Sequence, residues 1–199
     1  MNKKGTFICI EGLDGSGKTT QAKMLAKALR KSHNAVYTAE PSQGKIGTYI
    51  RERCLYGEKR LSGVIEALLF AADRIEHIEN EVLPALHQGK LVISDRYLYS
   101  SLAYQGAAGL SLEWIEKINE HALRPDLAIL IDVDPKTTIQ RLKPNKSVME
   151  NMETQQKVRK IYLNFVEKGS LTKINGDQPK NEVAKELYAV VMKFLNASH

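Results

Sequence analysis

Short apolar or β-branched segments alternate with segments of helical periodicity along the chain. The predicted strands are Thr6–Glu11, Ala35–Ala39, Leu91–Ser94, Leu127–Asp132 and Leu171–Asn175. Apolar residues at every third or fourth position predict helices at Lys18–Lys31, Ile46–Arg53, Ser62–Leu83, Tyr97–Gly106, Ser111–Ala122, Pro135–Leu142, Glu150–Lys168 and Asn181–Leu195. Strands that alternate with helices are typical of βαβ units, so the pattern predicts an α/β fold with a five-stranded parallel sheet.

The predicted helix Ser62–Leu83 carries apolar residues on more than one side and a mixed row on another. That row is Glu66, Phe70, Arg74 and His77, at positions i, i+4, i+8 and i+11. A planar ring one turn before an arginine suits a flat heterocycle, which Phe70 can stack on while Arg74 bonds a carbonyl edge or a phosphate. The alternative is that Phe70 belongs to the core and that Arg74 is solvated. For His77 we expect only a minor, solvated role.

Length and composition indicate an ordinary globular domain. The 199 residues are 43% hydrophobic and 26% charged, and no linker divides them, so we predict one domain over residues 1–199. The apolar run at Thr6–Ile10 is too short for a signal peptide or a membrane span. We therefore expect a cytoplasmic protein with no membrane partner. Cys9 and Cys54 lie far apart, without metal-ligand spacing, and are predicted to be reduced thiols.

The net charge of +6 does not by itself indicate a nucleic-acid partner. Basic residues are spread along the chain, and no recognition module for DNA or RNA is visible. A solvated surface with one local anion site explains the charge, so we expect no nucleic-acid partner.

The strongest motif is the run Gly12-Leu13-Asp14-Gly15-Ser16-Gly17-Lys18-Thr19, which matches G-x-x-x-x-G-K-[ST]. It follows a predicted strand and opens a predicted helix, as a phosphate-binding P-loop does. Glycines let successive backbone N–H groups point at phosphate oxygens, and the helix N-terminus adds partial positive charge. Lys18 is expected to reach the β- and γ-phosphates, and Thr19 to coordinate Mg²⁺. The predicted nucleotide ligands here are Gly12, Asp14, Gly15, Ser16, Gly17, Lys18, Thr19 and Thr20.

Two other interpretations of this loop are weaker. A glycine-rich turn that binds nothing does not explain the Lys18-Thr19 pair. A GTPase needs an N-K-x-D sequence for guanine, whereas Asn145-Lys146-Ser147-Val148 has valine in place of the carboxylate. ATP is therefore the predicted phosphoryl donor.

Asp95-Arg96-Tyr97 directly follows the third predicted strand. This position places an acid and a base at the carboxyl edge of the sheet, where open α/β folds bind ligands. Asp95 can hold Mg²⁺ through water, and Arg96 can grip a phosphate with two hydrogen bonds. A salt bridge within the protein is the alternative for this pair.

Taken together, these motifs resemble the thymidylate kinase family over a stretch from Phe7 to nearly the end of the chain. The residues that carry the resemblance are Phe7–Thr20, Glu40-Pro41, Ile46-Gly47, Arg51, Leu69–Arg74, Asp95–Tyr97, Ser100–Gly106 and Asn175–Pro179. The resemblance implies a three-layer α/β/α P-loop kinase fold and a homodimer. It also implies transfer of the γ-phosphoryl of Mg·ATP to thymidylate (dTMP), which gives dTDP and ADP.

The resemblance also implies a role for each matching residue. Asp14 would hold the 3′-hydroxyl of the deoxyribose, Tyr104 would lie beside the sugar, and Arg51 and Arg96 would hold the acceptor phosphate. Phe70 would stack on thymine, whose polar edge would bond three residues, namely Arg74, Ser101 and Gln105. Glu40 and Asp95 would arrange metal and water, with Thr19 and Asp95 as the metal ligands. The loop that contains Asn175 and Asp177 would lie against adenine.

The chain departs from the family pattern in two places. Gly15, not arginine, follows Asp14, and the segment 143–150 lacks the Asp-Arg-x-Glu sequence found in many family lids. We expect a basic residue of this region, Arg141, Lys143 or Lys146, to close over the phosphates instead. Ala39 also precedes Glu40 where bacterial relatives often have arginine.

Two rival functions remain open at this point. One is another nucleoside or nucleotide kinase on the same scaffold. The other is a regulatory nucleotide-binding module without transfer activity, which the presence of Lys18, Thr19, Asp95 and Arg96 argues against. A phosphate acceptor is already anionic, so transfer needs alignment and charge neutralisation but no general base.

Overall fold

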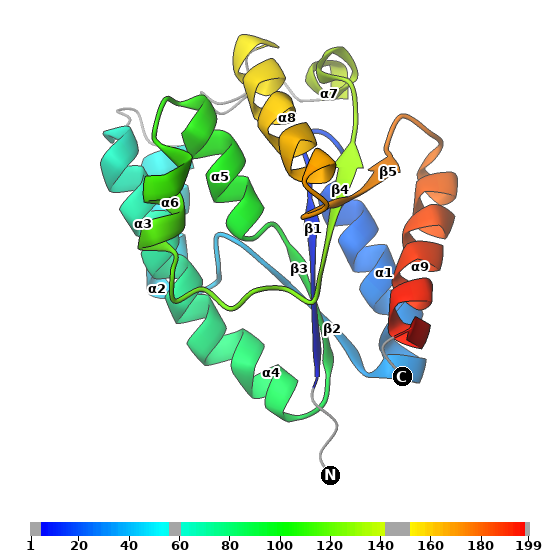
Figure 1. Ribbon diagram of the computed structural model, residues 1–199. Coiled ribbons are helices and arrows are strands. Elements are labelled where there is room, and N and C mark those ends of the chain that lie inside the picture. The colour runs from blue at the N-terminus through cyan, green and yellow to red at the C-terminus, as the bar shows by residue number, and fades with distance from the viewer. Residues whose placement is uncertain (1–4, 56–60, 142–151, 198–199) are drawn as a thin grey trace.

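The computed structural model describes residues 5–55, 61–141 and 152–197 (Figure 1). The strands are β1 (Thr6–Glu11), β2 (Ala35–Ala39), β3 (Leu91–Asp95), β4 (Leu127–Asp132) and β5 (Thr172–Asn175). The helices are α1 (Lys18–His33), α2 (Lys45–Ile50), α3 (Gly63–His77), α4 (Leu83–His87), α5 (Leu98–Ala107), α6 (Leu112–Ile118), α7 (Pro135–Arg141), α8 (Met152–Glu167) and α9 (Lys180–Ala197). Two π-helical segments, Arg51–Leu55 and Ile78–Val82, continue α2 and α3.

All five strands run parallel, in the order β2-β3-β1-β4-β5. This arrangement confirms the predicted parallel sheet. The central strand β1 pairs with β3, where Ile10 lies opposite Asp95, and with β4, where Glu11 lies opposite Leu130. Parallel strands end at the same edge, so residues that follow β1, β2 and β3 share one region of the surface.

Alternation along β1 builds a core on each face of the sheet. Phe7 and Cys9 belong to a cluster with residues of α5 and α8, whereas Ile8 and Ile10 belong to a cluster with α1 and α9. Figure 1 shows the same division, with α1 and α9 on one side of the sheet and α3 to α6 on the other. The predicted three layers are therefore confirmed.

The long helix predicted at Ser62–Leu83 is interrupted and extends further than expected. The Ser62 side chain caps α3 by accepting a hydrogen bond from the backbone N–H of Ile65 at 3.3 Å. The helix then widens into the π-helical segment Ile78–Val82 and continues as α4, which has Pro84 in its first turn. Proline cannot donate a backbone hydrogen bond, and the wider turn accommodates that loss.

The end of helix α6 also differs from prediction. Helix α6 ends at Ile118, four residues before the predicted end, and Asn119 after it has its side chain turned inward. The candidate lid at 143–150, with Lys143 and Lys146, lies outside the described residues. Within the part of the chain that is described, no helix is long and apolar enough to cross a membrane.

Candidate active site

The glycine-rich loop between β1 and α1 has the backbone conformation that its sequence predicts. Gly12 and Gly17 have φ angles of 154° and 88°, a region that side chains disfavour. A Cβ at Gly12 would also lie 2.7 Å from Oγ of Ser16, whereas one at Gly17 would meet nothing within 4 Å. Glycine is therefore favoured at position 17 by the backbone conformation and not by lack of space. The turn lets α1 begin at Lys18 with its N–H groups facing the loop.

Lys18 folds back over this loop. Its Nζ donates hydrogen bonds to the carbonyl oxygen of Leu13 at 3.2 Å and to Oδ1 of Asp14 at 3.3 Å. Burial, with Arg96 nearby, lowers the pKa of the ammonium, although Asp14 and Asp95 oppose this shift. An ammonium group that pairs with a carboxylate in this way can pair with phosphate oxygens instead.

Asp14 joins the loop to the carboxyl end of β3. Its Oδ1 accepts from Lys18 and also from Nη2 of Arg96. Burial raises the pKa of the Asp14 carboxyl, but Arg96 and Lys18 more than offset this and lower it to about 2. The backbone N–H of Asp14 donates to the hydroxyl of Tyr104 at 2.9 Å, and the Arg96 guanidinium lies 5.0 Å from the centre of the Tyr104 ring. The structure thus brings Asp14, Lys18, Arg96 and Tyr104 together.

Thr19 and Asp95, the two residues predicted to bind a metal, lie in hydrogen-bond contact. The Thr19 hydroxyl donates to Oδ2 of Asp95 at 2.5 Å, and Oδ1 of Asp95 is buried without a hydrogen-bond partner among the described residues. A hydroxyl beside a carboxylate with an unused oxygen fits Mg²⁺, which is held by few protein ligands together with phosphates and water. The described residues contain no cluster of three His, Cys, Asp or Glu side chains that could hold a metal.

Arg74 lies in a second buried cluster, formed by residues of α3 and α5 and by residues that directly follow β2 and α6. Only 1% of the residue is exposed. Its Nη2 donates to Oε2 of Glu40 at 2.6 Å and to Oγ of Ser101 at 3.1 Å, and its Nη1 donates to Oδ1 of Asn119 at 2.5 Å. The guanidinium also lies 5.1 Å from the centre of the Tyr97 ring. The alternative in which Arg74 is solvated is therefore wrong.

His77 belongs to the same cluster, contrary to the solvated role expected from the sequence. It is 1% exposed, with Nδ1 3.3 Å from Oε1 of Glu40 and Nε2 2.6 Å from Oγ1 of Thr38. The physical reason is helical spacing, because a residue three positions after Arg74 faces the same way. The sequence row that placed His77 beside Arg74 contained this signal.

Several unpaired polar atoms lie in or beside this cluster, among them the hydroxyl of Tyr97. Nε of Arg74 and Oε1 of Gln105 are buried and have no hydrogen-bond partner among the described residues. Gln105 lies one turn after Ser101 on α5, and the half-buried Phe70 lies one turn before Arg74 on α3. Nε of Arg74 is therefore an unpaired donor on α3, and Oε1 of Gln105 is an unpaired acceptor on α5.

Arg51 is fastened to the loop that follows β2. Its Nη1 donates to the carbonyl oxygens of Pro41 at 2.8 Å and Ser42 at 2.7 Å. Ser42 is bound in turn to Asp73 of α3, whose Oδ2 accepts from the backbone N–H at 2.9 Å and whose Oδ1 accepts from the hydroxyl at 2.6 Å. Through this chain of contacts the arginine expected at the acceptor phosphate is tied to the helix that carries Arg74.

The loop predicted to lie against adenine joins β5 to α9. Oδ1 of Asn175 accepts from the N–H of Asp177 at 3.0 Å, and Oδ2 of Asp177 accepts from the N–H of Asp134 at 2.8 Å. Arg141, at the end of α7, has Nη2 3.9 Å from Oδ1 of Asp177. Arg141 therefore lies next to this loop, apart from the Arg74 cluster, and Thr20 is exposed on α1.

Comparison with known proteins agrees with this geometry. A family model described as Thymidylate kinase matches residues 10–187. The probable thymidylate kinase of Pyrococcus abyssi is 47% identical over 197 residues, covering 94% of this chain and 96% of that protein. Those of Pyrobaculum calidifontis and Staphylothermus marinus are 43% and 38% identical and cover at least 93% of each chain. The chain belongs to the thymidylate kinase family of nucleoside monophosphate kinases.

Proposed function

We propose that this kinase transfers the γ-phosphoryl of Mg·ATP to thymidylate, with the glycine-rich loop as donor site and the Arg74 cluster as the site of the base. The observation that carries the proposal is that Nε of Arg74 on α3 and Oε1 of Gln105 on α5 are buried without a hydrogen-bond partner among the described residues. A buried polar atom without a partner costs free energy, so a ligand that pairs it gains affinity and specificity.

The base assignment follows from hydrogen-bond complementarity. Thymine has an acceptor, O4, beside a donor, N3–H, which matches the arginine donor and the glutamine acceptor. Cytosine has the reverse pattern, an amino donor beside a ring-nitrogen acceptor, and would leave both protein atoms unpaired. Glu40, Ser101 and Asn119 already bind the two terminal nitrogens of Arg74, which fixes the orientation of its guanidinium.

At the donor site, the backbone of Gly12–Thr19 would cradle the triphosphate, and Lys18 would neutralise its β- and γ-phosphates. Thr19 and Asp95 would hold Mg²⁺, which supplies charge neutralisation on the phosphates when bound. Arg96 and Arg51 would hold the acceptor phosphate. Because that phosphate is already anionic, these residues need only align the two substrates and stabilise charge.

Asp14 would serve both substrates. It holds Lys18 on the donor side and Arg96 on the acceptor side, and we assign to it the 3′-hydroxyl of the deoxyribose. Tyr104, whose hydroxyl binds the backbone of Asp14, would lie beside the sugar. The Asn175–Asp177 loop would contact adenine, and Arg141 or Lys146 would approach the phosphates.

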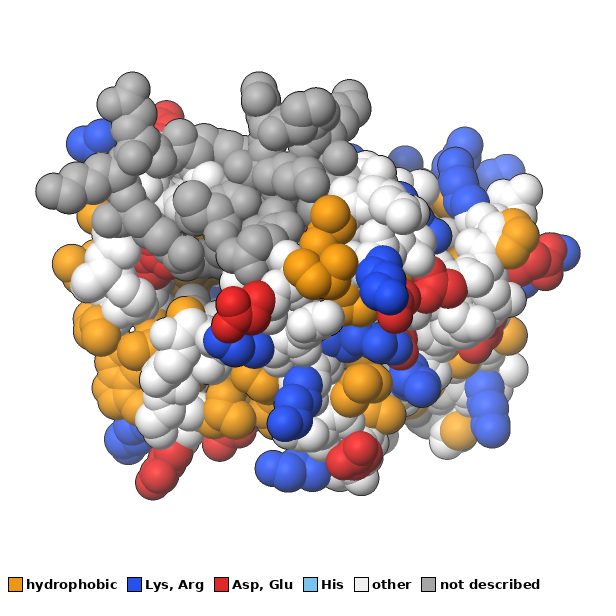
Figure 2. Space-filling model, turned by 90° about the horizontal axis from the view of Figure 1, so that it is seen from above, with side chains coloured by type: hydrophobic (Ala, Val, Ile, Leu, Met, Phe, Trp, Pro, Cys, Tyr) orange, Lys and Arg blue, Asp and Glu red, His pale blue; other side chains and the backbone are white. Residues whose placement is uncertain are grey.

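We also propose that the chain acts as a single kinase domain, in the cytoplasm, and as a homodimer. The support for a dimer is an apolar surface on α2 and α3, where Tyr49, Val64, Ile65 and Leu68 are each more than 40% exposed. Figure 2 shows hydrophobic side chains gathered along the edge of the molecule that carries α3 and α6. Exposed apolar patches of this kind mark association surfaces.

A panel of nucleoside monophosphates tests the activity directly. Purified protein is mixed with Mg·ATP and one monophosphate at a time, and ADP release is measured by a coupled assay. We expect release with dTMP, at least about tenfold less with dCMP, and little without an acceptor, because reversed base polarity leaves buried atoms unpaired. The variant Gln105→Leu should raise the KM for dTMP and leave the KM for ATP unchanged.

The same panel separates the two rival functions. Higher activity on cytidylate or adenylate than on thymidylate would show that this kinase prefers another base. ATP binding without acceptor-dependent ADP release would indicate a regulatory module.

A further inference from the structure

Glu11 is a buried carboxylate at the carboxyl end of β1 to which neither the sequence motifs nor the proposed reaction assigns a role. Its Oε1 accepts a hydrogen bond from the backbone N–H of Tyr97 at 3.0 Å. Its Oε2 accepts from the hydroxyl of Ser100 at 2.6 Å and from the hydroxyl of Tyr162 at 3.2 Å. Glu11 therefore connects three elements, which are β1, the loop that begins α5, and α8.

We propose that Glu11 is a positioning residue for Arg96 and that Tyr162 makes the position of Arg96 depend on helix α8. The inference rests on the phosphate-binding role proposed above for Arg96. It assigns to Glu11 no contact with substrate, since its carboxylate acts through Ser100 and through the backbone of Tyr97.

The backbone of Arg96 shows why such a residue is needed. Arg96 has a φ angle of 71°, a left-handed conformation that a long side chain rarely adopts and that its surroundings must enforce. The N–H of Arg96 donates to the carbonyl oxygen of Ile10 at 2.9 Å, and the next N–H, that of Tyr97, donates to Glu11. Both bonds come from the end of β1, so this strand holds the turn on both sides of the strained residue.

The side chain of Arg96 is held by the same group. Its Nη1 donates to Oγ of Ser100 at 2.9 Å, and that hydroxyl donates to Glu11. Its Nη2 pairs with Asp14, so the two ends of the guanidinium are fixed by two acids that flank Gly12 and Leu13. Glu11 thus orients Arg96 through one hydroxyl, whereas Asp14 binds it directly.

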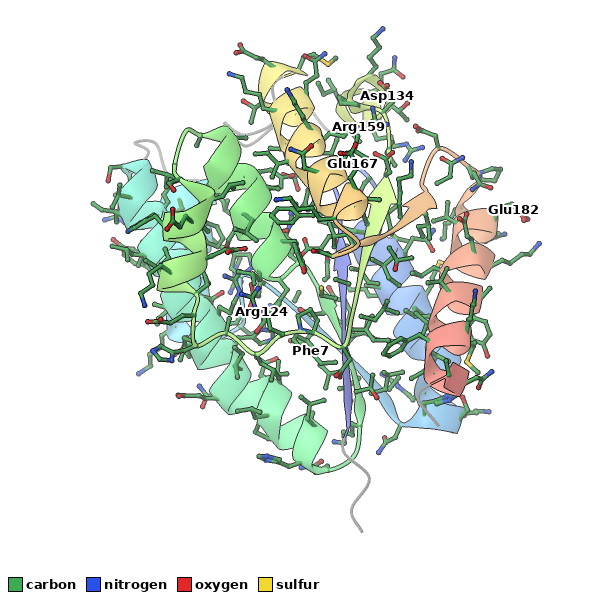
Figure 3. All side chains as sticks on the ribbon, in the orientation of Figure 1. Phe7, Arg124, Asp134, Arg159, Glu167 and Glu182 are labelled. Atoms are coloured by element: carbon green, nitrogen blue, oxygen red, sulfur yellow. The ribbon has the colours of Figure 1, made fainter. Side chains whose placement is uncertain are left out.

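Helix α8 is attached to the carboxyl edge of the sheet at two points. Tyr162 reaches Glu11, and its hydroxyl lies 3.1 Å from that of Ser100. Three residues earlier, Arg159 donates to both carboxylate oxygens of Asp132, at 2.7 and 3.0 Å, and its Nη1 lies 3.9 Å from Oδ2 of Asp134. Figure 3 shows Arg159 and Asp134 at the same end of the sheet. A movement of α8 would therefore displace the side chains of Glu11 and Ser100.

Burial of Glu11 and the groups around it act on its ionisation in opposite directions. Burial raises the pKa of its carboxyl to about 7, even though the hydrogen bonds from Ser100 and Tyr162 and the charges of Arg96 and Arg74 lower it. Glutamine has the same size and lacks the charge, so Glu11→Gln removes the charge with little change in packing.

The test compares two hydroxyl deletions between α5 and α8. Tyr162→Phe removes the hydroxyl that binds Glu11. The matched control, Tyr99→Phe, removes a hydroxyl that bonds Ser170, from a ring that packs against Phe165 at 5.3 Å. We expect Tyr162→Phe and Glu11→Gln to lower kcat for thymidylate by about tenfold, because a displaced positioning group misaligns the reacting phosphates. The KM for ATP should change less than about twofold, since the contacts of the donor loop remain. Tyr99→Phe should retain wild-type kcat.

A double variant tests whether Glu11 and Tyr162 act through the same interaction. The loss in Glu11→Gln combined with Tyr162→Phe should be clearly smaller than the product of the single losses, because both act through Arg96. Unchanged kcat in both single variants, or an equal loss in Tyr99→Phe, would overturn the inference. Wild-type protein that fails to use thymidylate would instead contradict the proposed function, which separates the two failures.

Discussion

At the scale of single residues, Asp14 determines how the glycine-rich loop differs from a generic phosphate cradle. Its carboxylate holds Lys18 and Arg96 at once, and these two cations lower its pKa to about 2. Asp14 is therefore ionised under all ordinary conditions. An acid at this position brings the groups proposed for the donor and the acceptor into one cluster.

Asp14→Asn should impair use of thymidylate more than binding of ATP. The amide keeps the shape of the side chain but loses the charge that orients Arg96, so we expect the KM for thymidylate to rise about tenfold or more. Steady-state kinetics with thymidylate and calorimetry with an ATP analogue measure the two effects. Asp126→Asn is the matched control, since Asp126 binds the N–H of Phe7 at the opposite end of β1. If the affinities for thymidylate and for the ATP analogue fell equally, Asp14 would serve only the phosphate-binding loop, which would contradict the prediction.

Glu11 should give the stability of the protein an unusual pH dependence. Its pKa is about 7 in the folded protein and 4.5 as a model value, so the native state holds the proton more tightly than the unfolded state does. Proton binding by Glu11 therefore adds to the free energy of unfolding. This stabilisation, about 3 kcal/mol, is fully present below pH 4.5 and is lost as the pH rises through 7. Denaturant titrations of wild type and Glu11→Gln at pH 4.5 and 7.5 check this. A stability difference between the two proteins that stays constant across this range would contradict it.

At the scale of elements, α3 connects the two groups that we propose for acceptor recognition. Arg74 lies in the cluster proposed to bind thymine. Its neighbour Asp73 binds Ser42, whose carbonyl oxygen accepts from Arg51. One rigid helix therefore sets the distance between the group proposed for the base and the group proposed for the phosphate. This arrangement explains why Asp73 is buried although it has no proposed contact with substrate.

Asp73→Asn should loosen the phosphate side of the acceptor site. The amide replaces one carboxylate oxygen by an NH2 donor and removes the charge, so the N–H and the hydroxyl of Ser42 can no longer each donate to a separate anionic oxygen. We expect the KM for thymidylate to rise about threefold to tenfold, and amide exchange of residues 42–46 to become faster. Glu113→Gln, an exposed change on α6, provides the baseline for both measurements. Unchanged exchange in residues 42–46 would mean that Asp73 does not fasten this loop.

At the scale of the whole molecule, the two outer layers differ in their exposed surfaces. The layer that contains α3 exposes several large apolar side chains, which we assign to a homodimer interface. The layer that contains α9 exposes Tyr188 at 40%. Figure 1 shows these helices on opposite sides of the sheet, so each can be changed independently of the other.

Leu68→Glu should therefore dissociate the protein, whereas Tyr188→Glu should not. Leu68 is 48% exposed, so the added charge is tolerated in a monomer but is costly in an apolar interface. Sedimentation velocity at micromolar concentration measures the effect. A wild-type protein that sediments as a monomer would contradict the assignment, as would a Leu68→Glu variant that remains dimeric.

The sequence predicted the framework of the molecule well because local patterns determine it. Strand β4 begins and ends as predicted, since its apolar run and its flanking residues are local signals. The sequence did not predict the burial of His77, the contact of Asn119 with Arg74, or the role of Glu11. These depend on tertiary contacts, and Glu11 and Tyr162 are 151 positions apart. A single acidic residue after a strand carries no pattern that reveals such a partner.

The most direct test of the whole account follows the γ-phosphoryl group itself. Protein, Mg²⁺ and ATP labelled at the γ-phosphate are incubated with thymidylate, and the nucleotides are separated by chromatography. The account predicts that the label appears in dTDP at the rate at which ADP forms, and that Lys18→Met reduces this transfer by at least about a hundredfold. Label that appears only as inorganic phosphate, or transfer to dCMP as fast as to thymidylate, would contradict it.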